Sequence, residues 1–142
     1  MSMTTILVAD DEDLLCNLYA EELKDAGYRV VTTCDAAELM DMIKVYGPDL
    51  VLLDIKMGRY NGLDLLQEIR NANYRMPVIL CTAYSSFKYD LKSIAADDYV
   101  VKSADLTELK LKIKAAIERV QHFVGQGARA RKRHHFSSLV TL

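Results

Sequence analysis

Four kinds of polar side chain follow short apolar runs in this sequence. The segment Asp10-Asp11-Glu12-Asp13 comes after the first run, Asp54 closes the third, Thr82 follows the fourth and Lys102 follows the fifth. Taken one at a time, acids often cap helices and a lysine is most often a solvated surface residue. Their shared position at the ends of apolar runs makes a common functional site the better interpretation.

This set of side chains predicts a magnesium site that supports phosphoryl transfer. Carboxylates in one crevice repel one another unless a cation lies among them or some take up a proton. Mg²⁺ prefers oxygen ligands and uses one or two carboxylates with a phosphate oxygen, which fits Asp11 and Asp54 with Asp10 nearby. The ion would shield an incoming phosphoryl group for attack by Asp54, giving an aspartyl phosphate. Thr82 and Lys102 would then contact phosphoryl oxygens.

The elements that must position these residues alternate along the chain. Five short apolar runs, at 6–8, 28–32, 50–53, 78–80 and 99–101, read as strands, and helical patterns separate them. Most runs are continuous rather than alternating, which is typical of parallel strands covered by helices on both faces. Five strands and five helices predict a doubly wound α/β fold. Such folds bind ligands beyond the carboxyl ends of their strands.

Helix boundaries can also be predicted from the sequence. The first helix should run from about Asp13 to Ala26 and should end at Gly27, with an apolar side made of Leu14, Leu15, Leu18, Tyr19 and Leu23. The last should run from about 106 to 124, because Gly125-Gln126-Gly127 interrupts its pattern. Three capping pairs mark further helix starts: Asp35 with Glu38, Asn61 with Asp64, and Asp105 with Glu108.

Composition excludes several other classes of protein. Of 142 residues, 51% are hydrophobic and 27% charged, a globular balance without a run long enough to span a membrane. The start lacks an export signal, so we expect a cytoplasmic protein. Three cysteines, Cys16, Cys34 and Cys81, suit packed, reduced thiols. All three histidines lie near or beyond the final helix, away from the strand ends, so nothing there resembles a zinc site.

Charge is unevenly distributed along the chain. The formal net charge is −2, but residues 125–142 hold four Arg or Lys and no acid, which leaves −6 for residues 1–124. An acidic body does not predict direct nucleic-acid binding by residues 1–124. We therefore expect one domain over 1–124, followed by a basic, flexible tail or linker over 125–142.

Four segments in this order resemble the receiver domains of two-component systems, over about residues 4–123. They are 6–12 (ILVADDE), 51–57 (VLLDIKM) with Gly62, Thr82-Ala83, and 96–102 (ADDYVVK). The resemblance implies a flavodoxin-like fold with strand order 2-1-3-4-5. It implies that Asp54 is the phosphoacceptor and that Thr82 and Lys102 assist it. Mg²⁺ would be held by Asp10, Asp11, Asp54 and the Lys56 backbone carbonyl.

The resemblance also implies how a signal would leave the domain. Phosphorylation would draw the Thr82 hydroxyl inward and let Tyr99 rotate, which remodels the face formed by helix four, strand five and helix five. The donor would be a sensor histidine kinase or a histidine phosphotransfer protein, and output would pass to a downstream protein partner. A phosphorylation-dependent dimer is compatible with this pattern. The domain would catalyse its own phosphorylation and dephosphorylation and would not be a metabolic enzyme.

Three positions depart from the pattern or add to it. Many receivers have proline where this chain has Gly58, so we expect a more mobile loop there. Many also have a proline behind a cis bond where this chain has Ser103; a cis bond before a non-proline residue costs about 2.5–4 kcal/mol. We therefore expect either a strained cis Lys102–Ser103 bond or a re-aimed Lys102. The Lys56 side chain, at the mouth of the site, is expected to affect the phosphate's lifetime.

Other functions remain compatible with parts of the sequence. The chain could act alone, or it could be the receiver part of a longer DNA-binding regulator or hybrid histidine kinase. A receiver that works without phosphorylation would also have this fold. A phosphatase of the haloacid dehalogenase type would need an acid two residues after Asp54, where this chain has Lys56.

Overall fold

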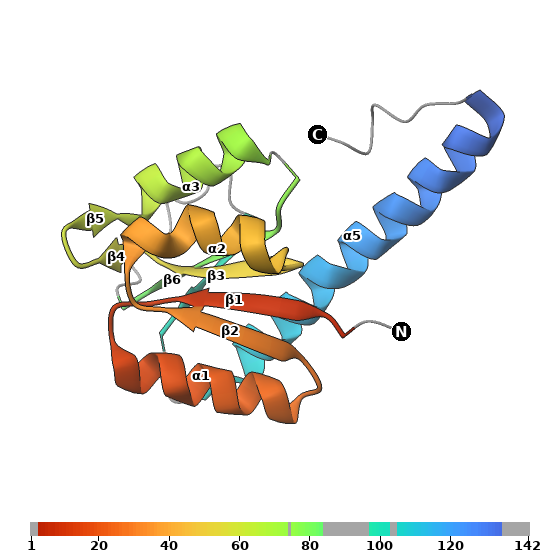
Figure 1. Cartoon of the computed structure of the whole chain (residues 1–142). Helices are drawn as coiled ribbons and strands as arrows, with labels where there is room; N and C mark the ends of the chain where they lie inside the picture. Colours follow the sequence, from red (N-terminus) through yellow and green to blue (C-terminus); the bar gives the residue numbers. More distant parts are fainter. Residues whose placement is uncertain (1–2, 74, 84–96, 103–104, 135–142) are drawn as a thin grey trace.

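A five-stranded parallel sheet forms the centre of the protein (Figure 1). The structure is a computed structural model, which describes residues 3–73, 75–83, 97–102 and 105–134, with side chains up to residue 120. The strands are β1 (Thr5–Ala9), β2 (Arg29–Thr33), β3 (Leu50–Asp54), β6 (Val78–Thr82) and β7 (Asp98–Val101). Their order is β2-β1-β3-β6-β7, with every neighbouring pair parallel. The predicted doubly wound sheet and its strand order are confirmed.

Helices cover both faces of this sheet. They are α1 (Asp13–Asp25), the 3₁₀ turn η1 (Ala36–Glu38), α2 (Leu39–Tyr46), α3 (Gly62–Ala72) and α5 (Thr107–His134). Side chains of α1 and α5 share one core cluster with β1 and β3, and side chains of α2 and α3 share the other. The fourth predicted helix would fall between β6 and β7, on residues 84–96, which lie outside the described part of the chain.

The central strands are apolar because both of their faces are covered. All five residues of β1, β3 and β6 are buried, whereas β2 is only partly buried at the edge. Burial of an aliphatic side chain stabilises the folded state by about 1.5–3 kcal/mol. The buried strands therefore fix where their carboxyl ends, and the polar residues that follow them, come to lie.

Several predicted helix signals are found in the structure. The Asp35 carboxylate accepts a hydrogen bond from Ala37 N–H at 2.9 Å, and the Asn61 side chain accepts one from Leu63 N–H at 2.8 Å. The Asp105 carboxylate accepts one from Thr107 N–H at 3.0 Å. Gly27 follows α1 with φ of +100°, a conformation that glycine adopts without steric cost.

The predicted end of the last helix is wrong. Helix α5 continues through Gly125 and Gly127 to His134, so it extends past the edge of the sheet (Figure 1). A helical glycine costs only about 1 kcal/mol relative to alanine, and the alanine and arginine residues that follow favour helix. Two glycines therefore weaken this helix without ending it. Residues 135–142 of the expected tail lie outside the described part.

The segment predicted as a loop after Asp54 is instead a short hairpin. Strands β4 (Lys56–Met57) and β5 (Tyr60–Asn61) pair antiparallel, with Gly58 at φ +59° in the turn. Gly62 follows the hairpin, and a Cβ at this residue would lie 2.4 Å from the Asp54 carbonyl oxygen. Only glycine allows α3 to begin this close to the end of β3.

Two expectations about side-chain burial are also wrong. On the expected apolar side of α1, Tyr19 and Leu23 are buried, but Leu14 is 85% exposed and Leu18 is 38% exposed. Cys34 is an exposed free thiol, whereas Cys16 and Cys81 are buried as expected.

Within the part of the chain that the structure describes, no helix is long and apolar enough to cross a membrane.

Candidate functional site

The four predicted strand-end residues meet at the carboxyl edge of the sheet. Asp54 ends β3 and Thr82 ends β6, while Asp10 and Lys102 directly follow β1 and β7. They adjoin a pocket of about 350 Å³, which is lined by Asp11, Glu12, Asp54, Ile55, Lys56, Thr82, Ala83 and Lys102. Because parallel strands end at one edge, residues up to 92 positions apart in sequence become neighbours here.

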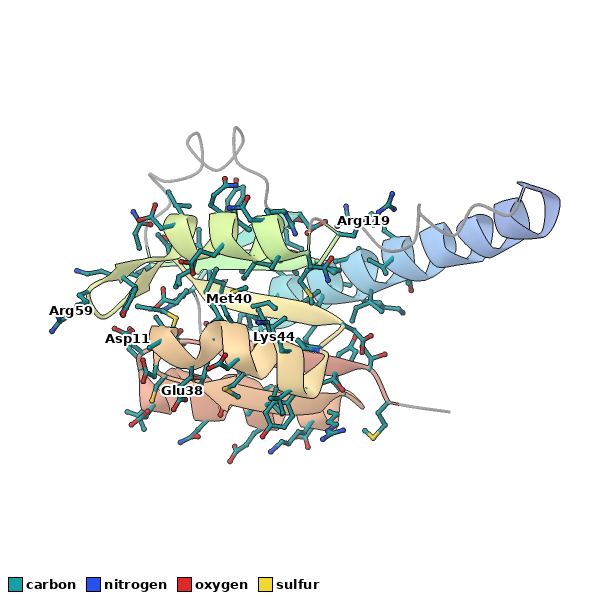
Figure 2. The ribbon with its side chains drawn as sticks, turned by 45° about the horizontal axis from the view of Figure 1, so that its top comes forward. Asp11, Glu38, Met40, Lys44, Arg59 and Arg119 are labelled. Carbon is teal, nitrogen blue, oxygen red and sulfur yellow. The ribbon has the colours of Figure 1, made fainter. Side chains whose placement is uncertain are left out.

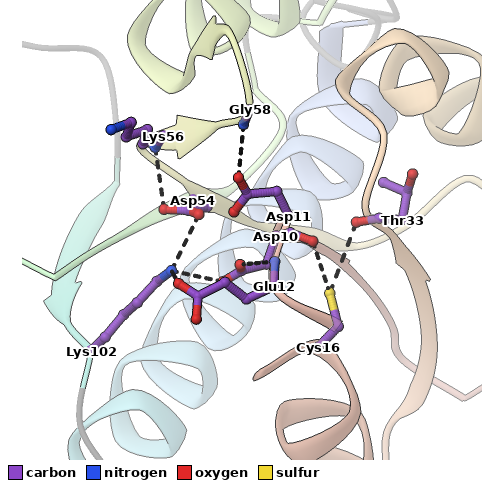
Figure 3. A network of polar contacts seen from close by, with 9 residues as sticks. All are labelled: Asp10, Asp11, Glu12, Cys16, Thr33, Asp54, Lys56, Gly58 and Lys102. Carbon is purple, nitrogen blue, oxygen red and sulfur yellow. Dashed lines mark hydrogen bonds and ion pairs between the residues drawn. The ribbon is translucent and has the colours of Figure 1, made fainter. Parts of the chain in front are cut away.

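The floor of the site, which we define as Asp10, Asp54 and Lys102, is a buried ionic group (Figure 3). The Lys102 Nζ lies 2.9 Å from Asp10 Oδ2 and 3.2 Å from Asp54 Oδ2. Asp10 is 2% exposed and Asp54 is 5% exposed. One ammonium thus links two carboxylates that water can hardly reach, and the predicted alternative of a re-aimed Lys102 is wrong. The Lys102–Ser103 bond itself lies outside the described residues.

The electrostatics of the floor raise the pKa of both Asp54 and Lys102. Burial, together with the negative charge of Asp10, raises the pKa of Asp54 to about 6, although the Lys56 N–H and Lys102 act against this. Burial alone would lower the pKa of Lys102, but its hydrogen bonds and charge interactions with Asp10 and Asp54 outweigh burial and raise it. Lys102 is therefore positively charged at neutral pH.

The rim of the site, which we define as Asp11, Glu12 and Gly58, is more exposed. The Asp11 carboxylate accepts a hydrogen bond from Gly58 N–H at 2.8 Å. Carboxylate oxygens of Asp10, Asp11 and Glu12 all lie within 4.8 Å of one another, close enough to share one cation. Glu12, which the sequence did not assign as a ligand, belongs to this group and also lies 3.8 Å from Lys102 Nζ.

The donor set fits Mg²⁺. Four carboxylates, from Asp10, Asp11, Glu12 and Asp54, meet at the site, and Lys102 is the one cation within 4 Å of them among the described residues. The remaining negative charge and the all-oxygen donors suit a hard divalent ion. The raised pKa of Asp54 has the same origin, because like charges and burial penalise its ionised form.

The predicted switch residues lie on the strands that flank this pocket. Thr82 is 2% exposed, and its carbonyl oxygen accepts a hydrogen bond from Lys102 N–H at 2.6 Å. Tyr99 lies on β7, three residues before Lys102, and is partly buried against the core. Lys112 on α5 lies 5.1 Å from the centre of the Tyr99 ring and donates to the Tyr99 carbonyl oxygen at 2.8 Å. No feature of the sequence predicted this contact.

A family model for the response regulator receiver domain matches residues 6–114. The chain belongs to this family. This match confirms the resemblance seen in the strand-end motifs. The receiver domain is a signalling module of two-component systems rather than a metabolic enzyme.

Solved receiver domains have the same fold. The response regulator TrrA from Thermotoga maritima, in a structure with Mg²⁺ and BeF, is 43% identical, with a TM-score of 0.76 over 80% of this chain and 99% of that one. A CheY-like receiver domain from Methanospirillum hungatei is 27% identical, with a TM-score of 0.78 over 85% of this chain and 98% of the other.

Curated relatives are longer proteins. The probable transcriptional regulatory protein TcrX of Mycobacterium tuberculosis is 32% identical over 81% of this chain but only 50% of its own length. The two-component response regulator PhoP of Pseudomonas aeruginosa is 32% identical over 84% of this chain and 54% of its own. This receiver chain thus spans about half the length of these two relatives.

Proposed function

We propose that this receiver domain accepts a phosphoryl group on Asp54 in the presence of Mg²⁺ and transmits the change to a protein partner. The observation that carries the proposal is the position of the Asp54 carboxylate. It is buried at the end of β3, 3.2 Å from the Lys102 ammonium, and it borders a pocket that Thr82 also lines. A nucleophile, a fixed cation and a hydroxyl residue therefore meet in one space.

Asp10, Asp11, Asp54 and the Lys56 backbone carbonyl are the proposed Mg²⁺ ligands, and the structure adds Glu12 as a neighbour of this group. When bound, the ion supplies positive charge that shields the phosphoryl oxygens from the acids around them. The acids provide the affinity for the ion, because its charge reduces the repulsion between neighbouring carboxylates.

The chain's own residues orient the transfer. An Asp54 oxygen forms a bond to phosphorus while the phosphorus–nitrogen bond of a phosphohistidine donor breaks. The Lys56 N–H holds Asp54 Oδ1 at 3.2 Å and Lys102 holds Oδ2, so the nucleophile is fixed before the donor arrives. Lys102 and the Thr82 hydroxyl then contact the transferred phosphoryl oxygens, which is the charge stabilisation that phosphoryl transfer requires.

The signal would leave through strand β7 and the helices beside it. The phosphoryl group draws Thr82 inward and allows Tyr99 to rotate, which changes the face made by helix four, β7 and α5. A partner that binds the two states with different affinity is sufficient to read the change. The helix-four part of this face lies outside the described residues.

The proposed donor is a sensor histidine kinase or a histidine phosphotransfer protein, in the cytoplasm. The proposed receiver covers residues 1–124, and residues 125–142 lead into a tail or linker. Because the curated relatives extend well beyond their matched part, we also propose that this receiver can belong to a longer DNA-binding regulator. A phosphorylation-dependent dimer through the β7–α5 face is the corresponding assembly.

Incubation with acetyl phosphate and Mg²⁺, followed by intact mass measurement, tests the chemistry. We expect one phosphoryl adduct in the wild type and in Asp41→Ala, whose exposed acid lies on α2, and none in Asp54→Ala. The wild-type adduct should disappear when EDTA removes the metal. No adduct under any condition would favour a receiver that works without phosphorylation.

A further inference from the structure

The backbone N–H of Gly58 connects the hairpin to the proposed metal site (Figure 3). It donates to Asp11 Oδ2 at 2.8 Å, across 47 positions of sequence. Gly58 has φ of +59°, and a Cβ built at this position would meet nothing within 4 Å. The glycine is therefore not required by crowding. What its backbone provides at this point is a hydrogen-bond donor aimed at a carboxylate, which a proline could not supply.

Two N–H groups of the hairpin hold two different acids. Lys56 N–H donates to Asp54 Oδ1 at 3.2 Å, and Gly58 N–H donates to Asp11 Oδ2 at 2.8 Å. In an extended segment, residues two apart direct their N–H groups to the same side. Strand β4 and the first residue of the turn therefore contact the phosphoacceptor and the exposed metal ligand along a single edge.

The hairpin itself is anchored, so its donors have fixed positions. The Met57 side chain, between the two donors, is 2% exposed and belongs to the core cluster on the α2 and α3 face. Lys56 pairs with Asn61 and Met57 pairs with Tyr60 across the hairpin. Directly after the hairpin, Gly62 N–H donates to the Ile55 carbonyl oxygen. A buried anchor on one side thus supports the hydrogen bond to Asp11 on the other.

We propose that the Gly58 N–H is a positioning group for the metal site: it holds one oxygen of Asp11 and leaves the other oriented toward the cation. The inference rests on the proposed function and deepens it. Within the described ranges, Gly58 is the one hydrogen-bond donor to the Asp11 carboxylate, whose side chain is otherwise exposed. Carboxylate ligands are usually hydrogen-bonded in this way, and loss of such a partner typically costs about 10–100-fold in metal affinity.

A Mg²⁺ titration of the ¹⁵N-labelled chain, followed by amide NMR shifts of residues 10–13, tests the inference without any phosphorylation. Gly58→Pro removes the N–H and also fixes φ at about −65°, whereas Gly58→Asn keeps the N–H and tolerates positive φ. Gly58→Asn therefore controls for loss of the glycine, and the hydrogen-exchange measurement below separates loss of the donor from a changed turn. We expect Gly58→Asn to bind Mg²⁺ within about twofold of the wild type and Gly58→Pro to bind at least about tenfold more weakly. Equal affinity in all three proteins would overturn the inference and leave the proposed function intact.

A second measurement remains decisive if Gly58→Pro does not fold. In the wild type, the Gly58 amide should be protected from hydrogen exchange, and this protection should persist at saturating Mg²⁺ and be lost in Asp11→Ala. Loss of protection when Mg²⁺ binds to the wild type would show that the cation competes with Gly58, which overturns the positioning role. A wild type that binds no Mg²⁺ at all would instead overturn both this inference and the metal requirement of the proposed function.

Discussion

The floor and the rim of the site hold their acids in different ways, although Asp10 and Asp11 are adjacent in sequence. Asp10 is 2% exposed and forms an ion pair with Lys102 at 2.9 Å, whereas Asp11 is exposed and is held by a backbone N–H of the hairpin. In the floor, strand ends fix every member. In the rim, the hydrogen bond to Asp11 comes from a short hairpin that is not part of the main sheet.

This difference separates stability from chemistry. Charges in the floor interact with little screening, and removal of Lys102 leaves two buried carboxylates without a cation. Charges in the rim are screened by water, so their contribution to folding is small. We therefore expect substitutions of the floor charges to change the free energy of unfolding. Substitutions of the exposed charges of the rim and the hairpin should change metal binding or phosphate lifetime with little effect on folding.

Replacing Lys102 should have the largest effect. Lys102→Met keeps the length of the side chain but leaves Asp10 and Asp54 buried without a cation, which costs about 3–5 kcal/mol for a broken buried pair. Urea unfolding, followed by far-UV circular dichroism at pH 8 without Mg²⁺, measures this change. The size of the loss should decrease at lower pH, because one carboxylate then takes up a proton.

Lys110→Met is the matched control for this substitution. Lys110 also forms an ion pair, with Glu22 at 2.9 Å between α5 and α1, but its side chain is 38% exposed. Exposed pairs contribute about 0–1 kcal/mol. Equal losses in the two variants would show that the floor is not a special region, and the contrast with the rim would fail.

Gly62→Ala should have the next largest effect on the free energy of unfolding, because Gly62 lies between the hairpin and the end of β3. The added methyl would lie 2.4 Å from the Asp54 carbonyl oxygen and 2.6 Å from Ile55 Cα, so the backbone of β3 or α3 must shift. Overpacking of this kind costs about 1–3 kcal/mol, and contact with rigid backbone places Gly62 at the upper end. Thermal unfolding with and without Mg²⁺ would measure it.

The comparison for this glycine is Gly58→Ala, four residues earlier. The same methyl group would enter open space there, and only the positive φ of +59° would carry a cost, of about 1–2 kcal/mol. A loss in Gly58→Ala as large as that in Gly62→Ala would mean that crowding against Asp54 is unimportant.

Asp54→Asn tests whether the ionised Asp54 carboxylate destabilises the folded state. The folded pKa of Asp54 is about 6, above its usual 3.8, so the wild type loses stability as the pH rises from about 4 to 6 and keeps the full penalty above that window. The amide carries no charge, so the variant should be more stable than the wild type by about 3 kcal/mol at pH 8 without Mg²⁺, and no more stable at pH 4.

Denaturation curves at pH 4, 6 and 8 provide the measurement, with Asp41→Asn on the surface of α2 as a control that should show no such window. A pH-independent difference between Asp54→Asn and the wild type would contradict the raised pKa. Added Mg²⁺ should narrow the difference at pH 8, because the cation relieves the same repulsion.

The floor was accessible from the sequence, and the rim was only partly so. Asp10, Asp54, Thr82 and Lys102 follow buried strands, and parallel strands bring their carboxyl ends to one edge whatever the loops do. Their convergence therefore follows from apolar runs that are plain in the sequence. The strand order did not follow from this logic and came instead from the resemblance to receiver domains.

The rim could not be derived in this way because it depends on local backbone geometry. Gly58 suggested a loop, since glycine permits many conformations, but its pairing in a hairpin and its hydrogen bond to Asp11 depend on the Met57 anchor. The end of α5 has a similar cause. Gly125 and Gly127 lower helix propensity by a small amount, and neighbouring residues decide the outcome.

The smallest predicted effect belongs to Lys56, whose side chain is exposed and whose residue lines the pocket. In a loose transition state for hydrolysis, charge moves from the phosphoryl oxygens to the leaving Asp54 oxygen. An ammonium at the mouth of the pocket that faces the phosphoryl oxygens would therefore stabilise the phosphorylated state. Lys56→Ala should shorten the phosphate's lifetime by about 1.5–5-fold, which corresponds to about 0.2–1 kcal/mol for an exposed charge.

Arg59→Ala provides the control, because Arg59 carries the same charge at the turn of the same hairpin but points away from the pocket (Figure 2). Decay of the purified phosphorylated protein, followed by intact mass at low and high salt, separates the two. The Lys56 effect should shrink at high salt, where exposed charges are screened. An unchanged lifetime in Lys56→Ala would limit the chemistry of the hairpin to its backbone N–H groups, and an equal change in Arg59→Ala would assign the effect to net charge rather than to position.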